Sequence, residues 1–133
     1  MKPPATTLDK HLYRQAFDKA ANRYDEAAVL QKEVGRRLLE RLDYVRIQPE
    51  CILDLGSGTG LCTTALGQRY KKAQIIALDI APAMLQQARN KQSWLEKTFS
   101  SRQRYLCGDA DCLPLKDQSV DMIVSNLTLQ WCP

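Results

Sequence analysis

The chain has 133 residues, 44% of them hydrophobic and 26% charged, which is typical of one globular domain and not of a disordered segment. The net charge of +4 is too small for a protein built to coat nucleic acid. Apolar stretches fall short of the roughly 18 residues that a membrane span needs, and residues 1–7 lack the apolar core of a secretory signal. We therefore expect a cytoplasmic protein with no nucleic-acid or membrane partner.

The N-terminal third has apolar residues at helical spacing. We predict two helices between residues 9 and 42, with a break at residues 22–25 and Asp25 as the N-cap of the second. Pro49 ends helical continuation, so residues 1–48 form a predicted helical segment. The two apolar series are Leu12, Ala16 and Ala20, then Leu30, Val34, Leu38 and Leu42.

Beyond Pro49, short apolar runs alternate with helix-compatible segments. Strands that alternate with helices indicate a parallel sheet, so the predicted fold class is α/β. In such sheets ligands bind where the strands end at their carboxyl side. The predicted strands are residues 51–55, 74–79, 105–107 and 120–125, and the predicted helices are residues 61–70 and 82–97.

The five cysteines are odd in number and include no Cys-x-x-Cys pair. Most lie in or beside apolar runs, which predicts reduced, buried thiols. His11 is the only histidine, so the sequence predicts no metal site. The cysteines are Cys51, Cys62, Cys107, Cys112 and Cys132.

The first predicted strand runs into a glycine loop, Asp54-Leu55-Gly56-Ser57-Gly58-Thr59-Gly60. Glycines let the backbone turn sharply and approach a ligand, and the helix from Leu61 offers free N–H groups. The spacing G-x-G-x-G differs from the G-x-G-x-x-G of dinucleotide-binding proteins. It resembles that of Rossmann-like S-adenosylmethionine (SAM) methyltransferases, in which Asp54 would hold the ammonium of the methionine part.

Three further strand ends carry polar residues. Asp79 lies 19 residues beyond Gly60, where a carboxylate can accept hydrogen bonds from ribose hydroxyls, or can serve as a turn residue ahead of the next helix. In Gly108-Asp109-Ala110 the aspartate can accept from an adenine amino group, or stabilise a turn. The stretch Ser125-Asn126-Leu127 follows the last strand, beside the expected sulfonium.

Together these motifs resemble the class I SAM-dependent methyltransferase superfamily. Two longer stretches are similar to malonyl-acyl-carrier-protein O-methyltransferases, the BioC family of biotin synthesis. They are Phe17-x-x-Ala20-Ala21-x-x-Tyr24-Asp25, with Leu30-Gln31 after it, and Ser125-Asn126-Leu127-x-Leu129-Gln130-Trp131-Cys132.

The resemblance implies methyl transfer from SAM to the free carboxylate of a malonyl thioester on acyl carrier protein or coenzyme A. A carboxylate is already ionised at pH 7, so no general base is expected. Tyr24 matches a family tyrosine on an active-site lid that positions substrate, although an aromatic on a helix face is an equally simple interpretation. The implied cofactor-binding residues are Asp54, Gly56, Ser57, Gly58, Gly60, Asp79, Ile80, Asp109, Ala110, Asn126 and Leu127.

The family's later strands are not found in the sequence, so we expect residues 49–133 to be the SAM-binding half of a domain, with weak SAM binding and little turnover. Two alternatives stay open. One is another small-molecule methyltransferase of the quinone-biosynthesis type, and the other is a SAM-binding fragment without activity. Residues 69–104 carry eight basic and two acidic side chains, which could steer an acidic carrier protein or form an ordinary solvated surface.

Overall fold

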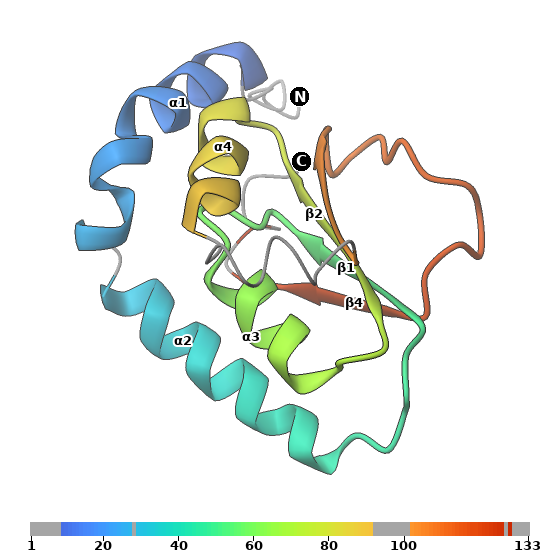
Figure 1. Cartoon of the computed structure of the whole chain (residues 1–133). Coiled ribbons are helices and arrows are strands. Elements are labelled where there is room, and N and C mark those ends of the chain that lie inside the picture. Colours follow the sequence, from blue (N-terminus) through green and yellow to red (C-terminus); the bar gives the residue numbers. More distant parts are fainter. Residues whose placement is uncertain (1–8, 28, 92–101, 127, 129–133) are drawn as a thin grey trace, which may run out of the picture.

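The computed structural model describes residues 9–27, 29–91, 102–126 and 128. The chain starts with two helices and then alternates strands with helices (Figure 1). The elements are α1 (Lys10–Ala27), α2 (Val29–Glu40), the 3-10 helix η1 (Arg41–Tyr44), β1 (Cys51–Leu55), α3 (Leu61–Arg69), β2 (Gln74–Asp79), α4 (Pro82–Lys91), β3 (Gln103–Cys107) and β4 (Met122–Ser125).

The four strands form one parallel sheet in the order β3-β2-β1-β4, which confirms the predicted α/β class. In the register, Ile52 of β1 lies opposite Ile75 of β2 on one side and Met122 of β4 on the other. The chain adds β2 and β3 on one side of β1 and then crosses to place β4 on the opposite side. The strand order therefore reverses between β1 and β4, the position where sheets of this kind open a crevice for ligands.

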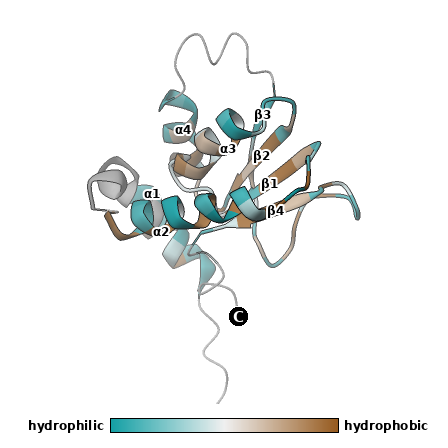
Figure 2. Ribbon diagram, turned by 90° about the horizontal axis from the view of Figure 1, so that it is seen from below, coloured by the Kyte–Doolittle hydropathy of each residue, from teal (hydrophilic) through white to brown (hydrophobic). Residues whose placement is uncertain are grey.

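One face of the sheet is covered by helices. Ile52, Ile75 and Val124 are buried there against Leu66 and Tyr70 from the segment of α3. Partly buried leucines of α2 and η1 complete this cluster. Right-handed crossovers from β1 to β2 and from β2 to β3 place α3 and α4 on the same side of the strands, as Figure 2 shows.

The opposite face is covered by the segment between β3 and β4. Leu53, Leu55 and Leu78 are buried against partly buried residues that include Leu115 and Val120. No helix of the described residues lies in that segment. Ile123 of β4 remains 56% exposed, so this face is sealed less completely than the helix-covered one.

The N-terminal helices differ from prediction in two respects. Helix α1 continues to Ala27, so the expected break at residues 22–25 and the expected N-cap at Asp25 are wrong. No Gly or Pro interrupts that stretch, and a single Asp does not end a helix by itself. In addition, Leu12 and Leu30 are 65% and 70% exposed, whereas the predicted pattern placed both on an inner face.

The cysteine prediction is only partly correct. Cys62 is buried, but Cys107 and Cys112 are exposed. Cys107 ends the edge strand β3, where alternate side chains face outward whatever their apolar neighbours do. Within the described residues, no group of His, Cys, Asp and Glu could hold a metal ion. No helix in the described ranges is long and apolar enough to cross a membrane.

Candidate functional site

The loop from β1 to α3 contains three glycines with positive φ, Gly56, Gly58 and Gly60. Gly56 and Gly60 have φ of +70° and +90°, a region that side chains with a Cβ rarely adopt. A Cβ on Gly60 would lie 2.8 Å from the Cβ of Ala88 in α4, and one on Gly56 would lie 2.0 Å from Oγ1 of Thr128. The loop therefore lies closely against its neighbours.

The end of β2 holds this loop in place. The backbone N–H groups of Gly56 and Ser57 donate to the carbonyl of Leu78, at 2.8 and 3.0 Å. The Asp79 carboxylate then accepts from Gly58 N at 2.8 Å and from Ala81 N at 2.9 Å. Asp79 thus joins the glycine loop to the turn before α4. The bond to Ala81 confirms a turn role, and two accepting oxygens leave capacity for further donors.

Asp54 is the most buried charged group of the site, with 2% of its surface exposed. Burial raises the pKa of its carboxyl to about 6, and the nearby Asp79 charge also raises it. The Thr63 hydroxyl donates to Oδ2 at 2.6 Å and opposes this shift. Among the described residues no Lys or Arg forms an ion pair with Asp54, so a cationic group entering here would be electrostatically favoured.

The reversal point between β1 and β4 contains a small cavity of about 30 Å³. The side-chain amide of Asn126 closes one side by donating to the carbonyl of Gln31 at 3.0 Å. Gly35 lets α2 come this close, since a Cβ there would lie 3.0 Å from Nδ2 of Asn126. Ser57 Oγ is buried and has no hydrogen-bond partner among the described atoms. The cavity is lined by Gln31, Asp54, Gly56, Ser57, Gly58, Thr59, Leu61, Cys62 and Asn126.

Asp109 lies at the neighbouring strand end, beyond β3. Gly108 N donates to the Asp79 carbonyl at 2.9 Å, which fixes the two strand ends side by side. The Asp109 carboxylate is bonded by Lys10 of α1, and this ion pair lowers its pKa. Ala110 is partly buried and packs against the cluster of Leu53, Leu55 and Leu78. Neither residue lines the small cavity.

Residues 52–133 match the family model of the methyltransferase domain. The chain belongs to this family. A malonyl-[acyl-carrier protein] O-methyltransferase of Gallionella capsiferriformans is 50% identical over 126 residues, which are 94% of this chain and 43% of the relative. The chain therefore spans less than half the length of that curated relative.

Two solved structures share the fold. A protein assigned as an S-adenosyl-L-methionine-dependent methyltransferase of Methanococcus maripaludis aligns with a TM-score of 0.70 at 22% identity, over 98% of this chain and 56% of that one. The second is a protein assigned as a methyltransferase, solved in complex with the Haloferax volcanii Trm112 methyltransferase activator. It aligns with a TM-score of 0.68 at 28% identity, over 82% of this chain and 46% of that one. The methyltransferase family confirms the predicted fold and implies SAM as cofactor.

Two polar groups of the site fit such a cofactor. The Asp54 carboxylate, which lacks a cationic partner among the described residues, and the buried Ser57 hydroxyl, which lacks a hydrogen-bond partner, both line the cavity at the strand reversal point. Sequence reasoning did not identify Thr63, Gln31 or Cys62 here. Thr63 lies nine positions after Asp54, on the first turn of α3, and its hydroxyl faces back to β1. This spacing was the signal in the sequence that could have identified it.

Some predicted residues are not placed. Leu127, Gln130 and Trp131 lie outside the described residues, and so do the side chains of Phe17 and Tyr24, although both belong to α1. Ile80 is partly buried, and its carbonyl accepts from the Cys107 thiol at 3.5 Å.

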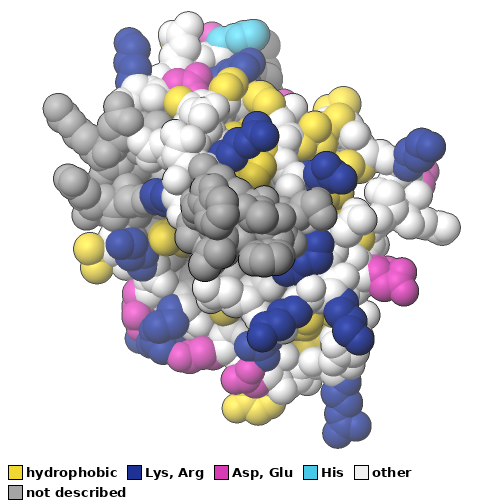
Figure 3. Space-filling view, viewed as in Figure 1, with side chains coloured by type: hydrophobic (Ala, Val, Ile, Leu, Met, Phe, Trp, Pro, Cys, Tyr) yellow, Lys and Arg dark blue, Asp and Glu magenta, His cyan; other side chains and the backbone are white. Residues whose placement is uncertain are grey.

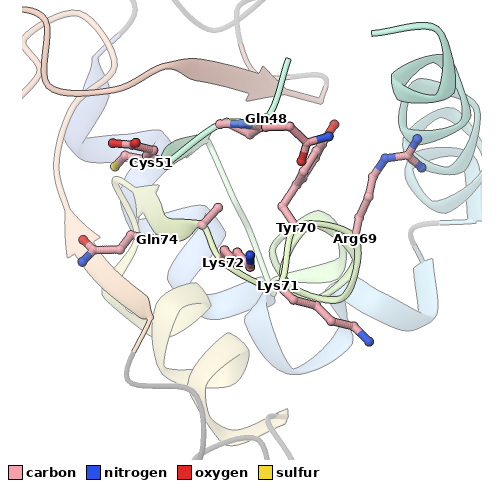
Figure 4. Close-up of a pocket in the computed structure, with 10 residues that line it drawn as sticks. Gln48, Cys51, Arg69, Tyr70, Lys71, Lys72 and Gln74 are labelled. Atoms are coloured by element: carbon pink, nitrogen blue, oxygen red, sulfur yellow. The ribbon is translucent and has the colours of Figure 1, made fainter. Parts of the chain in front are cut away.

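A larger opening lies at the opposite, amino end of the sheet. It measures about 840 Å³ and is bordered by Gln48, Tyr70 and Lys72, among others (Figure 4). Arg69 is paired with Asp43 at its rim.

One arginine of the basic stretch of residues 69–104 stabilises the fold itself. Arg102 donates to the carbonyls of Tyr70 and Ala73, at 2.9 and 2.8 Å, and thereby stabilises the turn that follows α3. On the face seen in Figure 3, Lys and Arg are spread among acidic side chains.

Proposed function

We propose that this chain binds SAM at the carboxyl ends of β1 and β2, as the cofactor-binding part of an enzyme that methylates the free carboxylate of a malonyl thioester on acyl carrier protein. The observation that carries the proposal is the buried Asp54 beside the glycine loop that Asp79 holds. The 50% identity to a malonyl-[acyl-carrier protein] O-methyltransferase supports the choice of substrate. A cytosolic location belongs to the same proposal.

In this proposal each strand end has its own task. Asp54 faces the cationic methionine part, and the remaining lone pairs of Asp79 accept from the ribose hydroxyls. Ser57 and Asn126 supply polar contacts close to the reacting centre. When bound, SAM supplies an activated methyl group on a sulfonium.

The residues have no proton to move, because a malonyl carboxylate is ionised at pH 7. Their contribution is positioning in line with the methyl group and exclusion of water, which can lower a barrier by several kcal/mol. The segment of residues 1–48, with Tyr24 on α1, is the proposed lid. Helix α2 already contacts the site through Gln31 and Gly35.

The test combines SAM binding with methyl transfer. The chain is titrated with SAM in a calorimeter, then incubated with labelled SAM and malonyl-acyl carrier protein. We expect saturable binding and a base-labile methyl ester on the carrier protein, formed slowly because the chain spans 43% of its relative.

Three results would change the proposal. Methyl transfer to a quinone precursor, but not to the malonyl thioester, would favour the quinone-biosynthesis alternative. Binding without transfer to either acceptor would support a SAM-binding fragment. Absence of SAM binding at millimolar concentration would contradict the cofactor site itself.

A further inference from the structure

The first residue of α1 reaches across to the strand end that carries Asp109. Lys10 Nζ donates to both Asp109 oxygens, at 2.8 and 2.7 Å, and it also pairs with Asp111. The side chains of Lys10 and Asp109 are 26% and 32% exposed, so the pair is partly withdrawn from water. One lysine thus holds two carboxylates that lie about a hundred residues further along the chain.

A second contact fixes the same helix about two turns later. The Asp18 carboxylate accepts from Ala83 N at 3.0 Å. Ala83 is the second residue of α4, where backbone N–H groups have no partner inside the helix, so Asp18 caps α4 from another element. Lys10 and Asp18 are eight residues apart, roughly 12 Å along a helix. Between these two contacts, Arg14 donates to the Cys107 thiol at the end of β3, at 3.8 Å. Helix α1 is therefore attached through Lys10, Arg14 and Asp18, over the strand ends of the proposed site (Figure 1).

The Lys10 ammonium binds Asp109, the residue predicted from the sequence to accept from the adenine amino group of the cofactor. An ammonium and an exocyclic adenine amino group both present N–H donors. Asp109 Oδ1 accepts from Lys10 and from Asp111 N at 2.9 Å, and Oδ2 accepts from Lys10, so the Lys10 ammonium bridges the two oxygens of Asp109. The cavity at the glycine loop holds about 30 Å³, far below the roughly 300 Å³ of a small-molecule site. That cavity alone is too small to enclose the cofactor.

We propose that Lys10 is an internal competitor of the cofactor: the docked α1 occupies Asp109, and the adenine displaces Lys10 when SAM binds. The inference rests on the proposed function, because it needs SAM at this end of the sheet. Release of α1 is then coupled to binding, and the apparent affinity is reduced by the fraction of molecules in which α1 is docked. Partly exposed ion pairs are weak, so we expect this factor to be small, about two- to fivefold.

The test compares Lys10→Met with Lys19→Met. Lys19 is exposed on the same helix, and among the described residues it forms no ion pair with Asp109. The control therefore removes the same charge from α1 without touching Asp109. Two quantities are measured for each variant and for the unaltered chain: the dissociation constant of SAM by calorimetry, and amide hydrogen exchange in residues 10–27 without SAM.

We expect Lys10→Met to bind SAM two- to fivefold more tightly and to exchange faster in α1, whereas Lys19→Met matches the unaltered chain in both. Unchanged exchange in Lys10→Met would show that Lys10 does not hold α1 and would overturn the inference. Weaker or equal SAM binding with faster exchange would also overturn it, because release of α1 would then give the cofactor no advantage. If none of the three proteins binds SAM, the proposed function fails, and the exchange data still report whether Lys10 holds α1.

Discussion

The two ends of the parallel sheet differ in what they bury. At the carboxyl end, a nearly inaccessible Asp54 and a buried Ser57 hydroxyl without a partner line a cavity of about 30 Å³, beside the glycine loop that Asp79 holds. At the amino end, an opening of about 840 Å³ is bordered by Lys71 and Lys72. Among the described residues, the end with more space has one buried hydroxyl without a partner, that of Tyr70, but no buried carboxylate.

If the proposed function is correct, the larger empty space is not where the chemistry takes place. Cations beside the end of α3 are the ordinary complement of a helix C-terminus, where carbonyl groups are exposed. A buried carboxylate such as Asp54 is costly unless a partner compensates it, which is why we propose that the ligand binds at its end of the sheet.

The largest effect is expected from Gly60→Ala, because the new Cβ would combine a φ of +90° with a contact of 2.8 Å to Ala88. Backbone strain of this kind costs about 1–3 kcal/mol, and displacement of the loop should abolish SAM binding. Thermal unfolding and calorimetry measure both effects. The control is Gly67→Ala in α3, where the nearest atom to a new Cβ belongs to the movable end of the Gln103 side chain. Equal loss in the two variants would contradict a special role for the loop.

A matched pair of aspartates separates the two ends directly. Asp79 accepts from two backbone N–H groups at the carboxyl end, and Asp121 accepts from Glu50 N and Cys51 N at the amino end. Replacing either by alanine leaves two N–H groups without their acceptor, a cost of about 1–3 kcal/mol. We expect Asp79→Ala to weaken SAM binding about 30-fold or more and Asp121→Ala to leave it within twofold. If Asp121→Ala alone caused a large loss of SAM affinity, the ligand would bind at the amino end, and the proposed site would be wrong.

Asp54→Asn should weaken SAM binding about tenfold and yet stabilise the chain at pH 7.5. The Asp54 pKa is about 6 when folded against a usual 3.8, so the folded state binds the proton more tightly. Stability from this group is therefore present below pH 3.8 and is lost as the pH rises through about 6. We expect the variant to gain up to about 3 kcal/mol at pH 7.5 and nothing at pH 3.5. A stability difference that does not change with pH would contradict the buried charge.

The smallest effect is expected at the amino end. Lys71→Gln combined with Lys72→Gln should change SAM affinity less than twofold, because both side chains lie at the end remote from the glycine loop. Surface charges act weakly at such distances in physiological salt. Calorimetry at low and physiological ionic strength checks this, and a tenfold loss would show that the larger opening takes part in binding.

Much of this arrangement could be predicted from local patterns. The strands from Cys51 to Leu55 and from Gln74 to Asp79 have the predicted bounds, because continuous apolar runs ended by Gly or Asp specify buried parallel strands. The predicted helix break at residues 22–25 is wrong, because a single Asp does not end a helix.

The contacts that depend on tertiary packing were beyond prediction. Thr63 on Asp54, Asn126 on Gln31 and Lys10 on Asp109 each join elements whose relative placement no local pattern encodes. The roles of the predicted cofactor residues remain predictions, which the variants above test one by one.

The central claim is that the cofactor binds at the carboxyl end of the sheet. Titration of the ¹⁵N-labelled chain with SAM tests it most directly, because each backbone amide reports its own surroundings. We predict the largest shifts at Gly56, Gly58 and Gly60, with Lys71 and Lys72 unchanged. Shifts confined to the residues around Lys71 and Lys72, with the glycine amides unmoved, would contradict the account.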